Sequence, residues 1–335
     1  MQLLGECQDY IWERGRWREF DGVFEKAIQA ATAVGQLDRA ASFLAYRAGL
    51  RQAFGDWRGA VRFAQQSLRV SPAGAASERA LFHLGAAAYD LGWYFRARKA
   101  LEKARAATRN MRHGAQIEHK LSRVYRWYGD LARADRAFRN ALGWAAGPPD
   151  GETDARQRRW LMAELLLDRV TVTAGTDPDV AMAMIAKSRQ IYADEHFQRG
   201  LAYADLAQAR LELGRGQPSA ARQLIADARA RLEEEQYAPG LSHVHFIVGM
   251  LERSTGRAAF PRALDAFDTS LRYATDARYE RAALRAAGMA LTTAWQSSSW
   301  GRITGVLGVL FRVGWRSSPR LLFARLRITL GPSVL

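Results

Sequence analysis

The chain is poor in cysteine, and it has no long apolar segment. Its single cysteine is Cys7, so no disulfide can form within the chain, which fits a reducing compartment. No run of about 18 uncharged apolar residues occurs, which argues against an ordinary membrane-spanning helix. The first residues lack the basic segment and apolar run of a secretory signal. We therefore expect a cytoplasmic protein.

Recognisable catalytic and metal-binding motifs are also absent from the sequence. The six histidines are scattered, no His-Glu-x-x-His motif occurs, and with one cysteine a zinc site is not expected. No phosphate-binding Gly-x-x-x-x-Gly-Lys loop and no nucleophile–base pair can be identified. We expect a protein that is not an enzyme and that holds no metal and no cofactor.

The sequence is rich in helix-forming residues and in positive charge. Alanine and leucine dominate, 48% of residues are hydrophobic and only 9 are proline, which favours a helical protein with a sizeable core. The formal net charge is +15. Such a charge suits an acidic partner, whether an acidic protein surface, an anionic membrane or nucleic acid. Alternatively, an excess of arginine over lysine reflects genome composition alone.

Glycines recur at a spacing that indicates helix pairs. They lie 40, 37 and 37 residues apart at Gly15, Gly55, Gly92 and Gly129. A small residue stands twelve positions after each of them, at Ala27, Ser67, Ala104 and Ala141. Glycine ends a helix readily because it adopts left-handed backbone, and small residues let antiparallel helices approach closely. The pattern predicts stacked helix pairs, with Pro72 ending one second helix.

The second half of the chain repeats this theme with longer turns. Gly214 and Gly256 are each followed seven residues later by an alanine, and the turns contain Pro218 and Pro261, which suit the start of a helix. Gly175 heads a more degenerate copy that leads into a helix over 180–192.

The pattern resembles the tetratricopeptide repeat (TPR) family over roughly residues 1–274. The best copy matches the family's leucine–glycine, aromatic, glycine, alanine, bulky and alanine positions with Leu84, Gly85, Tyr89, Gly92, Ala97, Leu101 and Ala104. The spacings are longer than the family's 34 residues. Their longer spacing is similar to that of the repeat arrays that follow signalling ATPases of the NB-ARC type. The sequence of residues 10–17 is also similar to these arrays. The resemblance implies an all-α, right-handed solenoid of antiparallel helix pairs.

In such repeats the first helix of each pair lines the concave surface. By position, we expect that surface to carry Arg79, Phe82, Tyr89, His119, Arg123, Arg126 and Trp127. These cations and aromatics suit an extended acidic peptide or a C-terminal carboxylate. They would equally suit single-stranded nucleic acid, with phosphates on arginines and bases on aromatics. In the alternative interpretation the aromatics are packing residues and the arginines form a solvated face.

After residue 296 the repeat pattern stops, and arginines alternate with short apolar runs. We expect residues 1–296 to form the solenoid and residues 297–335 to form a basic apolar tail. The tail contains no acidic residue. The residues expected to dock it are Trp300, Arg302, Phe311, Arg312, Trp315, Arg316, Arg320, Phe323, Arg325 and Arg327. Three interpretations stay open: an anchor at an anionic membrane surface, a segment that docks on the last repeat or on a partner, and self-association.

These observations predict a non-enzymatic adaptor or scaffold. It would bind an acidic protein or peptide through the concave surface and be tethered through the tail. One alternative is a membrane-associated subunit of a larger complex, held by residues 297–335. Another is a helical repeat protein that binds nucleic acid.

Overall fold

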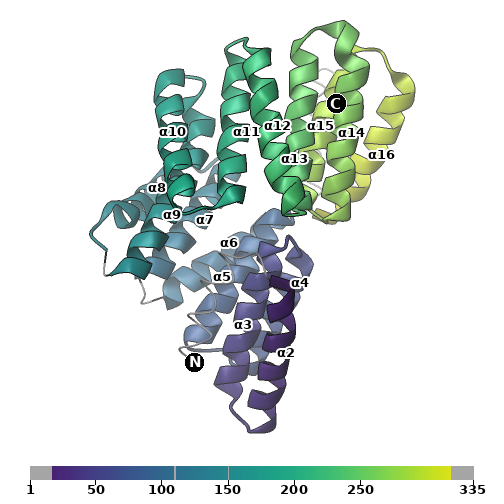
Figure 1. Ribbon diagram of the computed structural model, residues 1–335. Coiled ribbons are helices and arrows are strands. Elements are labelled where there is room, and N and C mark those ends of the chain that lie inside the picture. The colour runs from purple at the N-terminus through teal and green to yellow at the C-terminus, as the bar shows by residue number, and fades with distance from the viewer. Residues whose placement is uncertain (1–16, 109–110, 150, 318–335) are drawn as a thin grey trace. The chain divides into compact units, whose positions relative to one another are not determined.

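The chain folds as an all-α repeat solenoid. The computed structural model describes residues 17–108, 111–149 and 151–317, and within these ranges it contains fifteen α-helices, one short 3-10 helix and no strand (Figure 1). The chain divides into two compact units, 1–165 and 166–335. The fold class predicted from the repeat pattern is confirmed.

Unit 1 consists of helices joined by short turns. Its helices are α2 (Trp17–Ala33), α3 (Leu37–Ala53), α4 (Trp57–Val70), α5 (Ala75–Asp90), α6 (Tyr94–Ala107), α7 (Met111–Trp127), α8 (Leu131–Ala146) and the first part of α9 (Glu152–Thr173). Helices α3 and α4, α5 and α6, and α7 and α8 form close pairs. Helix α4 ends at Val70, two residues before Pro72, as expected.

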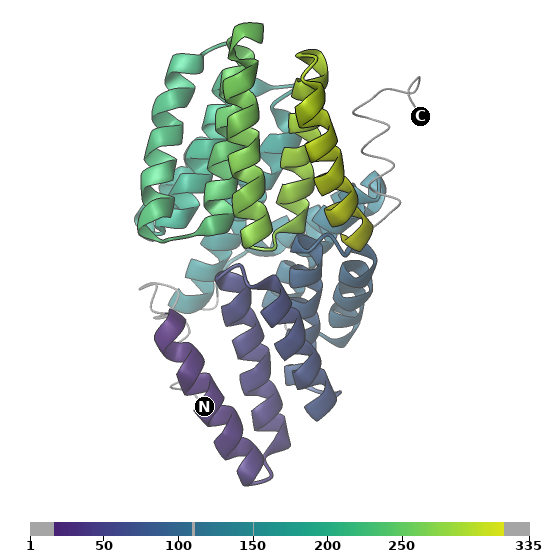
Figure 2. The ribbon, with the colours of Figure 1, turned by 90° about the vertical axis from the view of Figure 1, so that its right-hand side faces the viewer.

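Unit 2 continues the series from the second part of α9. Its helices are α10 (Pro178–Asp194), α11 (Gln198–Gly214), α12 (Pro218–Glu234), α13 (Ala238–Ser254), α14 (Phe260–Asp276), α15 (Glu280–Gln296) and α16 (Trp300–Ser317), with the 3-10 turn η1 (Arg257–Ala259) before α14. The pairs are α11 with α12, α13 with α14, and α15 with α16. Figure 2 shows these helices standing side by side.

The turns confirm the role of most of the repeating glycines. Gly55, Gly92 and Gly129 have φ angles of 78°, 73° and 76°, in the left-handed region that side chains disfavour. Gly15 lies outside the described residues. The expectation for Gly214 is wrong: this residue is the last of α11, and Gly216, with φ of 73°, makes the turn. The helix runs further than the sequence spacing indicated.

Several turns of unit 2 use the left-handed conformation without glycine. The residues concerned have φ angles between 50° and 53° and are His196, Gln236, Arg278 and Ser298. Each stands between two helices, where unit 1 has a glycine. A glycine-based alignment therefore missed these turns.

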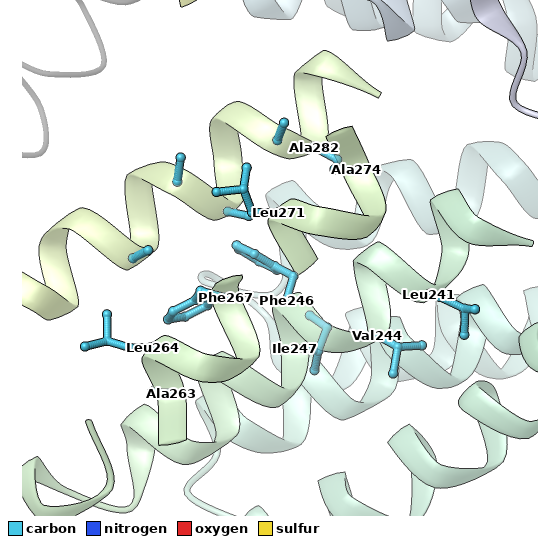
Figure 3. Packing of buried hydrophobic residues seen from close by; sticks show 14 of the residues in the cluster. Leu241, Val244, Phe246, Ile247, Ala263, Leu264, Phe267, Leu271, Ala274 and Ala282 are labelled. Atoms are coloured by element: carbon cyan, nitrogen blue, oxygen red, sulfur yellow. The ribbon is translucent and has the colours of Figure 1, made fainter. Parts of the chain in front are cut away.

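Small buried residues bring the helices of each pair together, as the repeat pattern predicted. Ser67 is fully buried, and its hydroxyl donates to the carbonyl oxygen of Ala41 on the paired helix at 2.7 Å. In unit 2, Ser242 on α13 and Ser270 on α14 each donate to the other's carbonyl oxygen, at 2.9 Å and 2.7 Å. Beside them the rings of Phe246 and Phe267 meet at 5.8 Å between centroids (Figure 3).

Residues 300–310 pack as the second helix of the last pair. Ile303, Val306 and Leu310 of α16 are buried in the same core as α13 to α15. Arg302 forms ion pairs with Asp265 and Asp268 of α14, at 2.8 Å and 2.5 Å. The expected boundary at 297 therefore falls between the two helices of one pair. No helix among the described residues is long and apolar enough to cross a membrane.

Candidate functional site

The first helices of successive pairs form the more closely spaced row in each unit. Helix α3 contacts α5 and α5 contacts α7 in unit 1, and α11 contacts α13 and α13 contacts α15 in unit 2. No comparable contact joins the second helices α4, α6 and α8 within the described residues. Side chains that bridge consecutive first helices therefore lie on one face of each unit.

Two predicted arginines form such bridges in unit 1. The Arg79 guanidinium on α5 lies 4.1 Å from the ring centre of Tyr46 on α3. Arg123 on α7 lies 5.0 Å from the ring centre of Tyr89 on α5. A guanidinium that stacks on an aromatic ring uses its flat face for that contact. The N–H groups at its edges stay available for hydrogen bonds. Both arginines are partly exposed, so a ligand can reach them.

Two of the predicted aromatics are packed among other side chains. Tyr89 is 7% exposed and meets the ring of Tyr94 edge to face at 5.5 Å. Trp127 stacks face to face on Tyr94 at 3.8 Å between ring centroids. The three rings join α5, α6 and α7, so Tyr89 and Trp127 take part in the packing between these helices, and Arg123 lies over Tyr89.

His119 is also enclosed, at 1% exposed. Its Nδ1 lies 3.3 Å from a carboxylate oxygen of Glu164 on α9, which Lys120 also approaches, at 3.8 Å. His119 thereby links α7 to α9 within unit 1. Of the remaining predicted residues, Phe82 and Arg126 are partly exposed on α5 and α7. We call Arg79, Phe82, Arg123 and Arg126 the unit 1 face.

A histidine that the sequence did not single out lies beneath this face. His83 Nδ1 lies 3.0 Å from the side-chain oxygen of Gln52, and its ring covers Gly49, where an added Cβ would lie 2.8 Å from it. Burial, assisted by the charges of Arg79 and His113, lowers the pKa of His83 to about 3. His83 is therefore neutral at physiological pH and packs α5 against α3.

Of the tail residues predicted to dock, only Arg302 has a side chain that the structure describes. Arg302 is paired with α14, as described above. The side chains of Trp300, Phe311, Arg312, Trp315 and Arg316 are not described, and Arg320, Phe323, Arg325 and Arg327 lie beyond the described residues. Their docking role stays a prediction.

The structure brings together a second set of cations that the sequence analysis missed. Arg210 on α11 and Arg281 and Arg285 on α15 all lower the pKa of His243 on α13, after burial itself. We call the three arginines the arginine cluster. One signal could have placed Arg285 near His243: Tyr203, His243 and Arg285 are each five residues past the start of successive first helices, at Gln198, Ala238 and Glu280.

The unit 1 face and the arginine cluster both present guanidinium groups. Among the described residues no group of three or more His, Cys, Asp or Glu side chains is arranged to hold a metal ion. The chemistry present is that of charge-assisted hydrogen bonding beside aromatic rings.

Comparisons with known proteins support the fold. No family model matches the chain, and no curated protein matches it. Among solved structures, a Rap protein complexed with competence and sporulation factor superposes with a TM-score of 0.59 at 10% sequence identity, covering 89% of this chain and 84% of that one. Yeast Tom70 also matches, with a TM-score of 0.24 at 10% identity over 93% of this chain and 95% of that one. The similarity to the Rap protein establishes a TPR-like helical repeat fold for this chain.

Proposed function

We propose that this protein is a non-enzymatic adaptor that binds an extended acidic segment of a partner protein on the unit 1 face. The observation that carries the proposal is the pair of arginines stacked on tyrosines of neighbouring first helices, Arg79 on Tyr46 and Arg123 on Tyr89. The stacking orders both side chains before binding, so less conformational entropy is lost when an acidic ligand is bound. Helices α5 and α7 each contribute one such arginine to the unit 1 face.

The solved structure of a Rap protein with its bound factor agrees with this proposal, because a chain of the same fold holds a ligand in that complex. We further propose that the chain works in the cytoplasm, either alone or within a larger signalling system. The link to NB-ARC-type arrays depends on the stretched repeats and on residues 10–17, which lie outside the described residues. It stays a prediction.

We propose that residues 318–335 form the tether, since part of α16 belongs to the core of unit 2. Ile303, Val306 and Leu310 of α16 are buried in the core that this helix shares with α13 to α15, so they are not available to lipid. Deletion of 297–335 would remove a core helix, so a tail deletion should begin at 318. Comparison of the full chain with a chain that ends at residue 317 would then separate tethering from binding.

The proposal is tested by reversing charge on the unit 1 face. Partners captured from the native host by the full chain are identified, and their acidic segments are synthesised and titrated by calorimetry. Arg79→Glu with Arg123→Glu should weaken binding at least about tenfold, because two charge-assisted contacts become repulsive. The matched control is Arg136→Glu, an exposed arginine on the second helix α8, which should bind like the original chain.

Two results would overturn the proposal. The first is equal binding by the original chain and the double variant. The second is capture of nucleic acid alone, with an affinity that falls steeply with salt. Loss of capture only on deletion of 318–335, with flotation on anionic vesicles, would favour the membrane alternative instead.

A further inference from the structure

Two second helices of unit 1 expose positive charge and no acidic side chain. Helices α6 and α8 each carry three exposed cations at a helical spacing of three or four residues: Arg96, Lys99, Lys103, Arg133, Arg136 and Arg139. We call these six side chains the basic stripes. The acidic residues in the sequences of the two helices are Glu102 and Asp135, and both are partly buried.

The corresponding helices of unit 2 have no such excess of positive charge. Helices α12 and α14 expose three cations and four carboxylates: Arg222, Arg262, Arg272, Glu233, Glu234, Asp265 and Asp276. A preference for arginine that came from genome composition alone would act on both units alike. The difference between helices with the same place in the repeat therefore indicates that the charge of the basic stripes serves a ligand.

Contacts through α7 place α6 and α8 beside each other. Tyr125 on α7 donates its hydroxyl to Glu102 of α6 at 3.0 Å, and the guanidinium of Arg133 on α8 lies 5.9 Å from the centre of the same tyrosine ring. Arg98 of α6 lies 5.3 Å from the ring centre of Tyr128, three residues before α8 begins. The two stripes therefore belong to adjoining helices of one surface.

Most cations of the basic stripes have no counter-charge within the described residues. Arg133 lies 3.3 Å from Asp130, and Arg139 lies 3.2 Å from Asp135. The other four stripe residues have no acidic partner in the part of the chain that the structure describes. Like charges three or four residues apart destabilise a helix. The stripes thus keep a repulsion that alternation with acidic residues would remove, and a polyanion would relieve it.

The spacing of the stripes suits a ligand with dense and regularly repeated negative charge. Successive stripe residues on one helix are about 4.5 to 6 Å apart along its axis. Duplex DNA carries one negative charge about every 1.7 Å of its axis, so each cation can meet a phosphate. An acidic peptide would have to be ordered to match these positions, whereas a duplex is already rigid.

Exposed apolar side chains are scarce on the two helices. The large ones are Phe95 and Leu131, and both lie in the first turn of their helix, to one side of the stripes. Binding of single strands relies on aromatic rings that stack on the bases, and membrane-surface helices bury an apolar face. The stripes offer neither. A duplex requires neither, because its phosphates face outward and its bases are stacked inside.

We propose that the basic stripes of unit 1 bind the phosphodiester backbone of duplex nucleic acid without reading its sequence. The ammonium and guanidinium groups contact phosphate oxygens and displace bound counterions. This surface lies on second helices, whereas the unit 1 face lies on first helices. The inference therefore goes beyond the adaptor function and does not depend on it.

The test titrates the full chain into a fluorescently labelled DNA duplex of about 24 base pairs and follows the anisotropy. If the four unpaired cations contact about four phosphates, affinity should fall about a hundredfold between 50 and 200 mM salt. A second duplex of scrambled sequence should bind equally well. An RNA duplex of the same length is measured beside them, and the tighter ligand identifies the kind of duplex that the surface prefers.

Lys99→Glu with Arg136→Glu reverses one charge in each stripe. This variant should bind the duplex at least about tenfold more weakly and with a smaller dependence on salt. Its fold should persist, because each new glutamate lies three residues from a stripe cation, Arg96 or Arg133, and circular dichroism checks this. The matched control is Lys187→Glu with Arg222→Glu on α10 and α12, which makes the same change in net charge at exposed positions of unit 2. The control should weaken binding no more than about threefold.

Other anions and the unit 1 face are tested in the same assay. Poly-glutamate and phosphatidylserine vesicles, at equal total charge, should bind at least about tenfold more weakly than the duplex. Arg79→Glu with Arg123→Glu should weaken duplex binding no more than the control pair does, which separates this proposal from the adaptor function. The proposal is overturned if the duplex does not bind, if the control pair weakens binding as much as the stripe variant, or if either other anion binds as tightly as the duplex.

Discussion

At the scale of the residue, Gly85 shows how closely the repeats pack. It lies in α5, and a Cβ built on it would lie 2.5 Å from Cγ of Leu101 and 3.2 Å from the carbonyl oxygen of Ala97, both on α6. Leu101 is itself fully buried, so it has little room to move. The glycine is therefore required by the contact between the two helices of the pair.

We predict that Gly85→Ala destabilises the protein by about 1–3 kcal/mol, because the added methyl group forces the paired helices apart. Urea unfolding followed by circular dichroism measures the change. Gly143→Ala is the matched control, since this glycine lies exposed in α8 with nothing within 4 Å of an added Cβ. It should stabilise by roughly 0.5–1 kcal/mol through helix propensity. An equal effect of the two substitutions would contradict the packing argument.

Gly85 and Leu101 are both positions of the repeat motif that the sequence revealed, and the structure shows that they contact each other. The packing of individual aromatic side chains was not predicted in the same way. Tyr89 and Trp127 were expected on a binding surface and are packed around Tyr94. Sequence position assigned them to the correct helices. Which rings pack together depends on contacts between separate helices, such as that of Trp127 on α7 with Tyr94 on α6, and no short motif specifies these contacts.

At the scale of the element, the turns of unit 2 store strain that those of unit 1 avoid. Gln236 lies between α12 and α13 with φ of 50°, and its backbone N–H donates to the carbonyl of Glu233 at 3.0 Å. Left-handed backbone is unfavourable for a residue with a Cβ. The turn persists because packing of the helices on both sides determines it.

We predict that Gln236→Gly stabilises the protein by up to about 1 kcal/mol, since relief of strain exceeds the added entropy of the unfolded chain. The free energy of unfolding in urea measures this. Ala226→Gly, at an exposed position inside α12, is the control and should destabilise by about 1 kcal/mol. Loss of stability in both variants would show that the turn is not strained.

Helix α16 illustrates what local sequence could not decide. Its apolar residues and arginines fit a membrane surface, a partner or the last repeat equally well by composition. The structure places Ile303 in the core of unit 2 and Arg302 against two aspartates of α14. Those aspartates precede Arg302 by more than thirty residues, so no short motif reveals the pairing.

At the scale of the whole molecule, each unit has cores of its own. The largest cluster in unit 2 joins residues of α11 to α16, with Phe267 fully buried. In unit 1, Leu101 is fully buried on α6. Repeat proteins gain stability from each repeat and from its contacts with the next one, so damage to one core spreads first to nearby repeats.

We therefore predict that Phe267→Ala, which should cost about 3–5 kcal/mol, accelerates amide hydrogen exchange in α13 to α15 much more than in α3 to α6. Hydrogen exchange followed by mass spectrometry measures both regions in one experiment. Leu101→Ala is the complementary variant and should reverse the pattern. Equal acceleration throughout the chain in either variant would mean that the two units unfold as one.

The sequence by itself determined the helical repeat architecture, because small residues and turn glycines recur along the chain at the distances that paired helices impose. Only the tertiary structure decided which cations find a counter-charge. Asp205 pairs with two arginines, whereas Arg210 and Arg285 have no acidic partner among the residues that the structure describes, although all of them lie on similar helices. The physical reason is that electrostatic pairing depends on distances between separate helices, which a linear pattern does not specify.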